Sequence, residues 1–250
     1  MSKVKDTLGF RYIKETFFDR HNIHVGEKPD ISPCTMYKTY PDKPKAPLPR
    51  RWDGGETNIW KIIQSRRSKR QYTSQPLTRT ELTLLLWAGH GITAQAGPVY
   101  LRTTPSAGAI YPIETYCVIS KVLDIEKGIY HFDVKGFQLE QLLKGNYRKE
   151  VARIALDQEF CAKAPVIFIW TAVLRRGMCR YGDRAIRYMF MDAGHICQNV
   201  LLAATALGLN ACPIGAFFDG EMNDLLQLDE EEETCIYMAS IGRKPANTLY

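Results

Sequence analysis

Residues 165–173 read PVIFIWTAV, and this run sets the centre of the expected fold. It is almost entirely apolar and rich in β-branched and aromatic residues, which is typical of a strand buried on both faces. Residues 183–207 form the longest helical pattern in the chain, which ends at Gly208. Small residues recur along that pattern, so another helix can approach its backbone closely. A buried strand followed by a long helix predicts a fold that contains both a sheet and helices.

Further strand and helix patterns extend along the chain on both sides. Strands are expected at 114–120, 128–133, 137–139 and 234–241, and helices at 8–19, 58–64, 78–89, 147–156 and 222–226. Thr78 and Glu81 have the spacing of a capping box, in which each side chain bonds to the backbone of the other residue at the start of a helix. Residues 229–233 are expected to form a solvated acidic turn. The class is therefore α+β, with a mixed or antiparallel sheet wrapped by helices.

Prolines set the N-terminal region apart from the rest. Six of them lie between His24 and Arg51, so an extended arm is expected there instead of a long regular element. Such an arm must lie on another surface, and a second subunit is one candidate. We therefore expect residues 1–60 to form a helix and an arm, and residues 61–250 to form a single structural domain.

Composition and charge limit the classes of protein to which the chain can belong. The chain has 250 residues, 45% of them hydrophobic, and a formal net charge of +6, which suits an anionic ligand but is small for a nucleic-acid-binding surface. The seven cysteines include no CxxC pair and the five histidines no HExxH, so neither a disulfide framework nor a metal site is predicted. The chain shows neither a signal peptide nor the ~18 uncharged apolar residues of a membrane span. We expect a cytoplasmic protein with no nucleic-acid or membrane partner.

Residues 66–70 read RRSKR and crowd four cations into five positions. Guanidinium groups and a hydroxyl together donate charge-assisted hydrogen bonds that suit a phosphate. The sequence has no GxxxxGK[ST] and no GxGxxG after a strand, so a mononucleotide is a better candidate ligand than a nucleoside triphosphate or a dinucleotide. A basic run of this kind is also common on solvated faces, and that interpretation stays open.

Two other segments are small enough to let a flat ligand approach the backbone. Residues 105–109 read PSAGA and residues 213–216 read PIGA. Ordinary turns would have the same composition. His90 and His195 each follow Ala-Gly near an apolar helical face, so both are expected to be packed rather than catalytic.

Taken in order, these segments resemble the nitroreductase superfamily of flavoproteins, and in particular its SagB-type dehydrogenase branch, the thiazole/oxazole oxidases. The resemblance covers roughly residues 61–244 and is carried by PLTRTELTLLLWAGHGIT, RTTPSAGAIYPIETYCV, GIYHFD, KAPVIFIWTAV, RYGDRAIRYMFMDAGHICQNVLLAATALGLNACPIGAFFD and SIGRK. It implies an α+β, nitroreductase-like fold and an intertwined homodimer that binds FMN at the subunit boundary.

The resemblance also implies a role for each matching residue. The cofactor-binding residues would be Arg66, Arg67, Ser68 and Arg70 at the phosphate and ribityl chain, Pro105, Ser106, Ala107 and Gly108 from the other subunit, Ile214 and Gly215 at the ring, and Arg243 near the phosphate. Where the branch has a Lys-Tyr pair, this chain has Arg180 and Tyr181. Tyr181 is the candidate catalytic base or proton relay, and Arg180 is the cation that would lower its pKa. A solvent-exposed pair ahead of a helix capped by Asp183 is the alternative interpretation.

The implied activity is hydride transfer between a substrate and FMN, with a thiazoline or oxazoline ring in a peptide as the candidate substrate. One alternative is an NAD(P)H-dependent nitroreductase, flavin reductase or quinone reductase that uses the same pocket. Another is a flavin-binding protein without turnover. Surface solubility is the expected role of the other arginines in this region, Arg175, Arg176, Arg184 and Arg187, and recruitment of an acidic peptide or a nicotinamide phosphate is the alternative.

Overall fold

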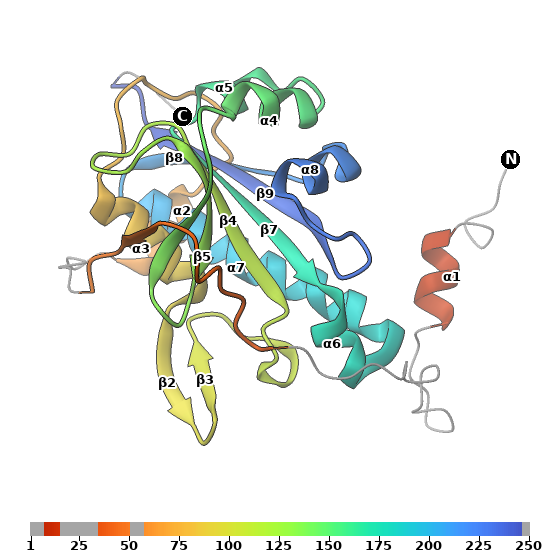
Figure 1. Ribbon diagram of the computed structural model, residues 1–250. Coiled ribbons are helices and arrows are strands. Elements are labelled where there is room, and N and C mark those ends of the chain that lie inside the picture. Colours follow the sequence, from red (N-terminus) through yellow and green to blue (C-terminus); the bar gives the residue numbers. More distant parts are fainter. Residues whose placement is uncertain (1–7, 16–34, 51–57, 247–250) are drawn as a thin grey trace, which may run out of the picture.

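A seven-stranded antiparallel sheet forms the centre of the computed structural model, which describes residues 8–15, 35–50 and 58–246 (Figure 1). The strand order is β1-β6-β5-β4-β7-β9-β8, and β2 and β3 form a separate hairpin. The strands are β1 (Lys45–Pro47), β2 (Ile92–Ala96), β3 (Val99–Arg102), β4 (Ile113–Ile119), β5 (Gly128–Asp133), β6 (Gln138–Lys144), β7 (Val166–Val173), β8 (Leu209–Ile214) and β9 (Glu233–Arg243). The helices are α1 (Leu8–Glu15), α2 (Ile59–Ser65), α3 (Arg79–His90), α4 (Arg148–Ile154), α5 (Glu159–Lys163), α6 (Leu174–Tyr181), α7 (Ala185–Ala206) and α8 (Asp219–Leu226), with short 3-10 turns at η2 (Ala107–Ala109) and η3 (Gly182–Arg184).

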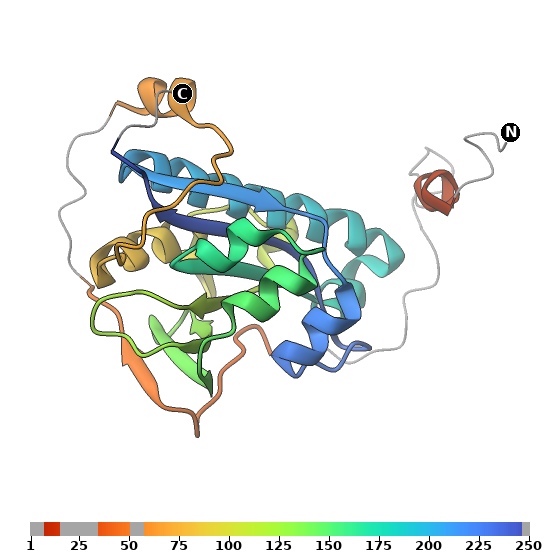
Figure 2. The same ribbon diagram turned by 90° about the horizontal axis from the view of Figure 1, so that it is seen from above.

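Strand β7 occupies the middle of the sheet between β4 and β9, and all of its residues are buried. Its side chains alternate between two cores. Phe168 and Trp170 belong to the core that includes residues of α3 and α7, whereas Ile167 and Ile169 belong to the core that includes residues of α4, α5 and α8. Figure 2 shows the corresponding layers, with α7 along one face of the sheet and α4 and α5 on the other. The predicted doubly buried strand is therefore confirmed, because helices cover both of its faces.

Helix α7 confirms the long helix and shows what its small residues do. Ala193 and Ala204 are buried in the core, and α3 approaches α7 so closely that a Cβ on Gly89 would lie 3.2 Å from Ile196 Cγ2. Gly194, by contrast, has open space beside it. The expected cap at Asp183 is wrong: Asp183 lies in η3 and the cap residue of α7 is Arg184, which makes no side-chain cap bond.

The capping box at the start of α3 is confirmed. The Thr78 side chain accepts a hydrogen bond from Glu81 N at 3.1 Å, and Glu81 Oε2 accepts one from Thr78 N at 2.7 Å. Helix α3 ends at His90 and is followed by Gly91 as its C-cap. Among the described helices, none is both long and apolar enough to cross a bilayer.

The described part of the proline-rich arm, residues 35–50, lies on the sheet of its own chain. Strand β1 forms an edge of the sheet and pairs with β6. Tyr40 N donates to Glu140 Oε2 at 2.8 Å, and Lys38 Nζ donates to Tyr116 Oη at 2.7 Å and forms an ion pair with Glu233. A second subunit is therefore not needed to support this part of the arm. The remainder of the predicted arm lies outside the described residues, and the division at residue 60 stays a prediction.

Two charged residues expected at the surface are buried. Glu233, predicted to lie in a solvated turn, begins β9 and accepts hydrogen bonds from Thr171 at 2.6 Å and Tyr116 at 3.0 Å. Arg176, predicted to promote solubility, is only 4% exposed and pairs with Glu114 at 2.7 Å. The physical reason is the same in both cases: a partner distant in sequence compensates the buried charge.

Candidate functional site

The basic run 66–70 lies along the free edge of the sheet. Ser68 bridges Ala211 of β8, the last strand in the sheet order, and Lys69 N donates to Ala211 O at 2.9 Å. Ile214 and Gly215, predicted to contact the ring of a flavin, stand at the end of the same strand. We call Arg66, Ser68, Arg70, Ile214 and Gly215 the basic edge.

The arginines of this run differ in what they contact. Arg67 Nη1 donates to two backbone carbonyls, Gln64 O at 3.1 Å and Arg66 O at 2.8 Å. Within the described part of the chain, Arg66 and Arg70 have no carboxylate within salt-bridge distance, and Arg70 lies 5.6 Å from the centre of the Phe160 ring. Arg66 and Arg70 therefore present uncompensated guanidinium groups, whereas Arg67 is folded back on its own backbone.

Neutral groups line the basic edge near Gly215. A Cβ on Gly215 would meet only the ring of Tyr237, at 3.9 Å, and Tyr237 in turn contacts the Cys197 thiol. Burial raises the pKa of Tyr237 to about 12 and that of Cys197 to about 12. Both side chains are therefore uncharged near neutral pH. No local sequence pattern indicates Tyr237, because its position follows from the pairing of β8 with β9.

A second group forms where η2 meets the end of α6. Gly108 has a positive φ of 60°, and a Cβ there would collide with the Tyr181 hydroxyl and lie 3.0 Å from Arg180 Nη1. The Arg180 guanidinium is exposed, 5.5 Å from the centre of the Tyr181 ring, and its Nη1 lies 3.4 Å from Gly108 O. We call Pro105 to Gly108 together with Arg180 and Tyr181 the tyrosine turn.

Asp192 of α7 fastens the tyrosine turn and was missed in the sequence. Ser106 Oγ donates to Asp192 Oδ2 at 2.6 Å and accepts a hydrogen bond from Tyr111 N at 2.9 Å. Burial raises the pKa of Asp192 in spite of the hydrogen bonds from Ser106 and the Ala107 backbone. An aspartate on the buried face of a predicted helix was the signal that could have found it.

The remaining predicted residues lie apart from both groups. Arg243 forms a two-pronged ion pair with Glu81, at 2.6 and 2.7 Å, so its predicted contact with a phosphate would compete with this pair. His90 is buried and its pKa is lowered by burial and by Arg102 to about 3, while its Nε2 has no partner among the described residues. His195 is exposed, so the expectation that it is packed is wrong.

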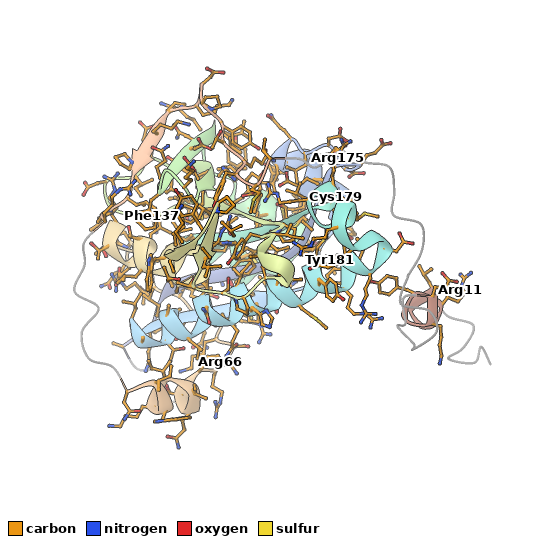
Figure 3. The ribbon with its side chains drawn as sticks, turned by 90° about the horizontal axis from the view of Figure 1, so that it is seen from below. Arg11, Arg66, Phe137, Arg175, Cys179 and Tyr181 are labelled. Carbon is orange, nitrogen blue, oxygen red and sulfur yellow. The ribbon has the colours of Figure 1, made fainter. Side chains whose placement is uncertain are left out.

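The basic edge and the tyrosine turn are separate groups within one chain. Figure 3 shows Tyr181 near the start of α7 and Arg66 further along that helix. The Arg66 charge acts on Cys197, which lies 12 residues after Ala185, and 12 residues of helix span about 18 Å at about 1.5 Å per residue. Among the hydrogen bonds and ion pairs of the described residues, none joins the basic edge to the tyrosine turn.

These features define an α+β protein with a basic sheet edge and a separate aromatic turn. A family model described as the nitroreductase family matches residues 63–243. The chain belongs to the nitroreductase family, and the predicted α+β, nitroreductase-like fold is confirmed.

Two relatives illustrate the range of this family. A protein of Methanocaldococcus jannaschii described as a candidate nitroreductase is 38% identical over 189 residues, which cover 76% of this chain and 92% of that protein. The trifolitoxin-processing protein TfxB of Rhizobium leguminosarum is 33% identical over 140 residues, which cover 51% of this chain and 36% of TfxB. The likeness to TfxB agrees with the SagB-type branch predicted from the sequence.

Two solved structures share the fold. The Escherichia coli microcin synthetase McbBCD complex with truncated pro-MccB17 bound gives a TM-score of 0.62 at 18% identity and covers 94% of this chain and 86% of that one. A candidate nitroreductase of Desulfovibrio desulfuricans in complex with FMN gives a TM-score of 0.53 at 20% identity and covers 78% of this chain and 91% of that one.

Proposed function

We propose that this protein is an FMN-dependent oxidoreductase of the SagB type, in which two copies of the chain form each flavin site. The observation that carries the proposal is the pair of guanidinium groups on Arg66 and Arg70. No carboxylate among the described residues compensates their charge, and the same sheet edge carries the open backbone of Gly215. This arrangement fits a phosphorylated planar group, with charge at its tail and space at its ring. The relation to a solved neighbour that is described in complex with FMN supports the choice of cofactor.

In this proposal the basic edge anchors the cofactor. Arg66 and Arg70 would hold the phosphate together with the Ser68 hydroxyl, and the backbone at Ile214 and Gly215 would lie against the ring. FMN would supply the chemistry by accepting or donating a hydride. The neutral Tyr237 and Cys197 side chains add no charge near the ring, because burial raises the pKa of both.

The tyrosine turn would come from the second copy. Tyr181 would take or relay the substrate proton, and Arg180 would stabilise the deprotonated phenol without itself accepting a proton. Asp192 would hold the turn in place through Ser106, since the Ser106 hydroxyl donates to its carboxylate at 2.6 Å.

The exposed surface of α7 supports the pairing of two chains. Phe190 and Met191 are 56% and 53% exposed, and Gly194, one turn further along, leaves open space beside the helix. On α2, Trp60 is 75% exposed. Apolar side chains next to a small residue suit close packing of a helix from another copy.

The two candidate functions differ in their substrate. The relative TfxB and the McbBCD complex with bound pro-MccB17 favour oxidation of a ring in a peptide. The relative from Methanocaldococcus jannaschii favours an NAD(P)H-dependent nitroreductase that uses the same pocket. Under anaerobic conditions NAD(P)H would bleach the bound flavin of a nitroreductase, and it would leave the flavin of an enzyme that oxidises a peptide ring unchanged.

Replacing Arg66 and Arg70 together with alanine tests the anchor. The double variant should purify without the yellow colour of flavin, because the phosphate would lose its charged donors. Arg67→Ala should stay yellow, since Arg67 already donates to backbone carbonyls. Lys61→Ala/Lys163→Ala removes the same charge from two exposed positions and should also stay yellow. A yellow Arg66→Ala/Arg70→Ala protein would refute the assignment of the anchor.

Replacing Tyr181 with phenylalanine tests turnover. The variant should retain flavin and lose substrate oxidation, because only the phenol oxygen is removed. Full oxidation by Tyr181→Phe would exclude the phenol from proton transfer, whereas a wild-type protein that binds FMN and never turns over would be a flavin-binding protein.

A further inference from the structure

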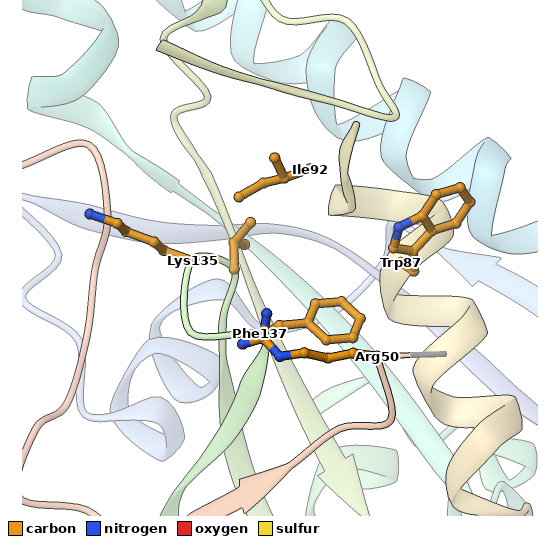
Figure 4. A pocket seen from close by; sticks show the side chains of 6 residues that line it. Arg50, Trp87, Ile92, Lys135 and Phe137 are labelled. Atoms are coloured by element: carbon orange, nitrogen blue, oxygen red, sulfur yellow. The ribbon is translucent and has the colours of Figure 1, made fainter. Parts of the chain in front are cut away.

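A cavity of about 310 Å³ lies outside both the basic edge and the tyrosine turn (Figure 4). Four segments enclose it: the end of α3, the start of β2, the turn between β5 and β6, and the end of the arm. The lining residues are Arg50, Trp87, Ile92, Val134, Lys135 and Phe137. Its volume falls in the range of about 300–1,000 Å³ that is typical of sites for small molecules.

Flat and apolar side chains form most of this cavity. Figure 4 shows the Trp87 indole on one side and the Phe137 ring facing the space, with Ile92 across from Phe137. The Trp87 ring lies over Gly91, where a Cβ would come within 2.5 Å of its Nε1. Because residue 91 is glycine, the indole can lie in this position, so one wall of the cavity is fixed before a ligand arrives.

Two cations stand at the cavity without a compensating carboxylate. Arg50 Nη2 donates to Gly136 O at 2.6 Å and its guanidinium lies 5.9 Å from the centre of the Phe137 ring. The Lys135 ammonium lies 5.7 Å from the centre of the Tyr37 ring. Across the described ranges, neither cation has an aspartate or glutamate within 4.0 Å.

The carboxylate nearest to Lys135 along the chain already accepts two hydrogen bonds. Asp133 Oδ1 accepts a hydrogen bond from Gly136 N at 2.9 Å, and Asp133 Oδ2 accepts one from Gln138 Nε2 at 3.0 Å. These bonds shape the turn that carries Lys135. The cavity therefore combines aromatic walls with an excess of positive charge.

We propose that this cavity is a binding site for a small aromatic carboxylate. The ring of the ligand lies between Trp87 and Phe137, its carboxylate accepts hydrogen bonds from Arg50, and the positive charge of Lys135 attracts it at longer range. The site shares no residue with the basic edge or the tyrosine turn, so its ligand is distinct from the flavin. A ligand there also ties the arm, through Arg50, to the β5–β6 turn.

Calorimetry on the full-length protein tests the site with indole-3-carboxylate as the probe and the uncharged indole-3-carboxamide as its matched control. The acid should bind about tenfold or more tightly than the amide, because only the acid forms charge-assisted hydrogen bonds. The double variant Arg50→Gln/Lys135→Gln should bind the acid at least about tenfold more weakly than the wild type does, and its affinity for the amide should be unchanged. Lys149→Gln/Lys163→Gln, which removes two exposed charges elsewhere, should bind the acid as the wild type does.

Three results would overturn the proposal: no saturable binding of the acid, equal affinity for acid and amide, or undiminished binding of the acid by Arg50→Gln/Lys135→Gln. The visible absorption of the purified protein adds a check on location. If the acid bound against the flavin instead, it would perturb that spectrum, and its binding would persist in the double variant. That result would place the acid outside this cavity.

Discussion

At the scale of single residues, a buried network of charges around Glu114 holds several elements together. Arg176 donates to Glu114 Oε1 at 2.7 Å, and His131 lies between Glu114 and Glu140 at 3.1 and 3.0 Å. The partners are distant in sequence, so the sequence could not identify them. The basic run, by contrast, could be recognised because its charges are adjacent.

Replacing Glu114 with glutamine should strongly destabilise the fold. The change leaves the buried Arg176 without its carboxylate, and breaking a buried pair costs about 3–5 kcal/mol of unfolding free energy. Glu126→Gln is the matched control, because Glu126 forms an exposed pair with Lys144 and should matter little. Urea unfolding of both variants measures the difference, and equal losses would contradict the role of the network.

The same network predicts how stability depends on pH. Burial opposes the charge on Glu114, but Arg176 and the hydrogen bond from His131 outweigh burial and lower the pKa of Glu114 from 4.5 to about 2. Its contribution is therefore present above pH 4.5 and is lost as the pH falls toward 2. Burial likewise opposes the charge on His131, but hydrogen bonds to Glu114 and Glu140 raise its pKa above 6.5.

The raised pKa of His131 makes the unfolding free energy change with pH in the opposite direction. Its contribution is fully present below pH 6.5 and is lost as the pH rises through the pKa of the folded state. The unfolding free energy of the wild type should therefore decline from about pH 6.5 up to that pKa, and His131→Gln should remove this part of the decline. Urea unfolding across a pH series measures both slopes, and an unchanged alkaline slope in His131→Gln would contradict the assignment.

At the scale of elements, the sequence predicted those parts whose signals are local. The strand 165–173 was recognisable from its apolar run, and α3 from its capping box. Helix α6 was not predicted, because it has only 8 residues, its arginines make it strongly polar overall, and its place depends on packing. A Cβ on its Gly177 would lie 3.2 Å from Ala185 Cβ of α7, a contact between helices that no local pattern indicates.

Two glycines with nearly the same backbone test the packing of the tyrosine turn. Gly97 and Gly108 have φ of 59° and 60°, but a Cβ on Gly97 meets nothing within 4 Å, whereas one on Gly108 collides with Tyr181. Alanine should cost about 1 kcal/mol at either position from strain, and about 1–3 kcal/mol more at position 108 from overpacking. Unfolding free energies measure the difference, and equal losses would mean that Tyr181 does not pack against the turn.

At the scale of the whole molecule, the site that the sequence predicted is divided. The resemblance predicted residues of both halves, whereas the contacts of Asp192 and Tyr237 depend on the packing of α7 and the pairing of β9. Tyr181 lies near the start of α7 and Arg66 further along that helix. The central claim is therefore that the basic edge of one copy meets the tyrosine turn of another to form each flavin site.

Mixed dimers test this claim most directly. One chain carries Arg66→Ala/Arg70→Ala and the other carries Gly108→Val, so that each homodimer has a defect in both of its sites. In the mixed dimer one site contains both defects and the other contains neither. The account predicts flavin-poor homodimers and a mixed dimer, isolated with two affinity tags, that binds one FMN per two chains. A mixed dimer as poor in flavin as its parents would contradict the account, because it would place both halves of each site in the same chain.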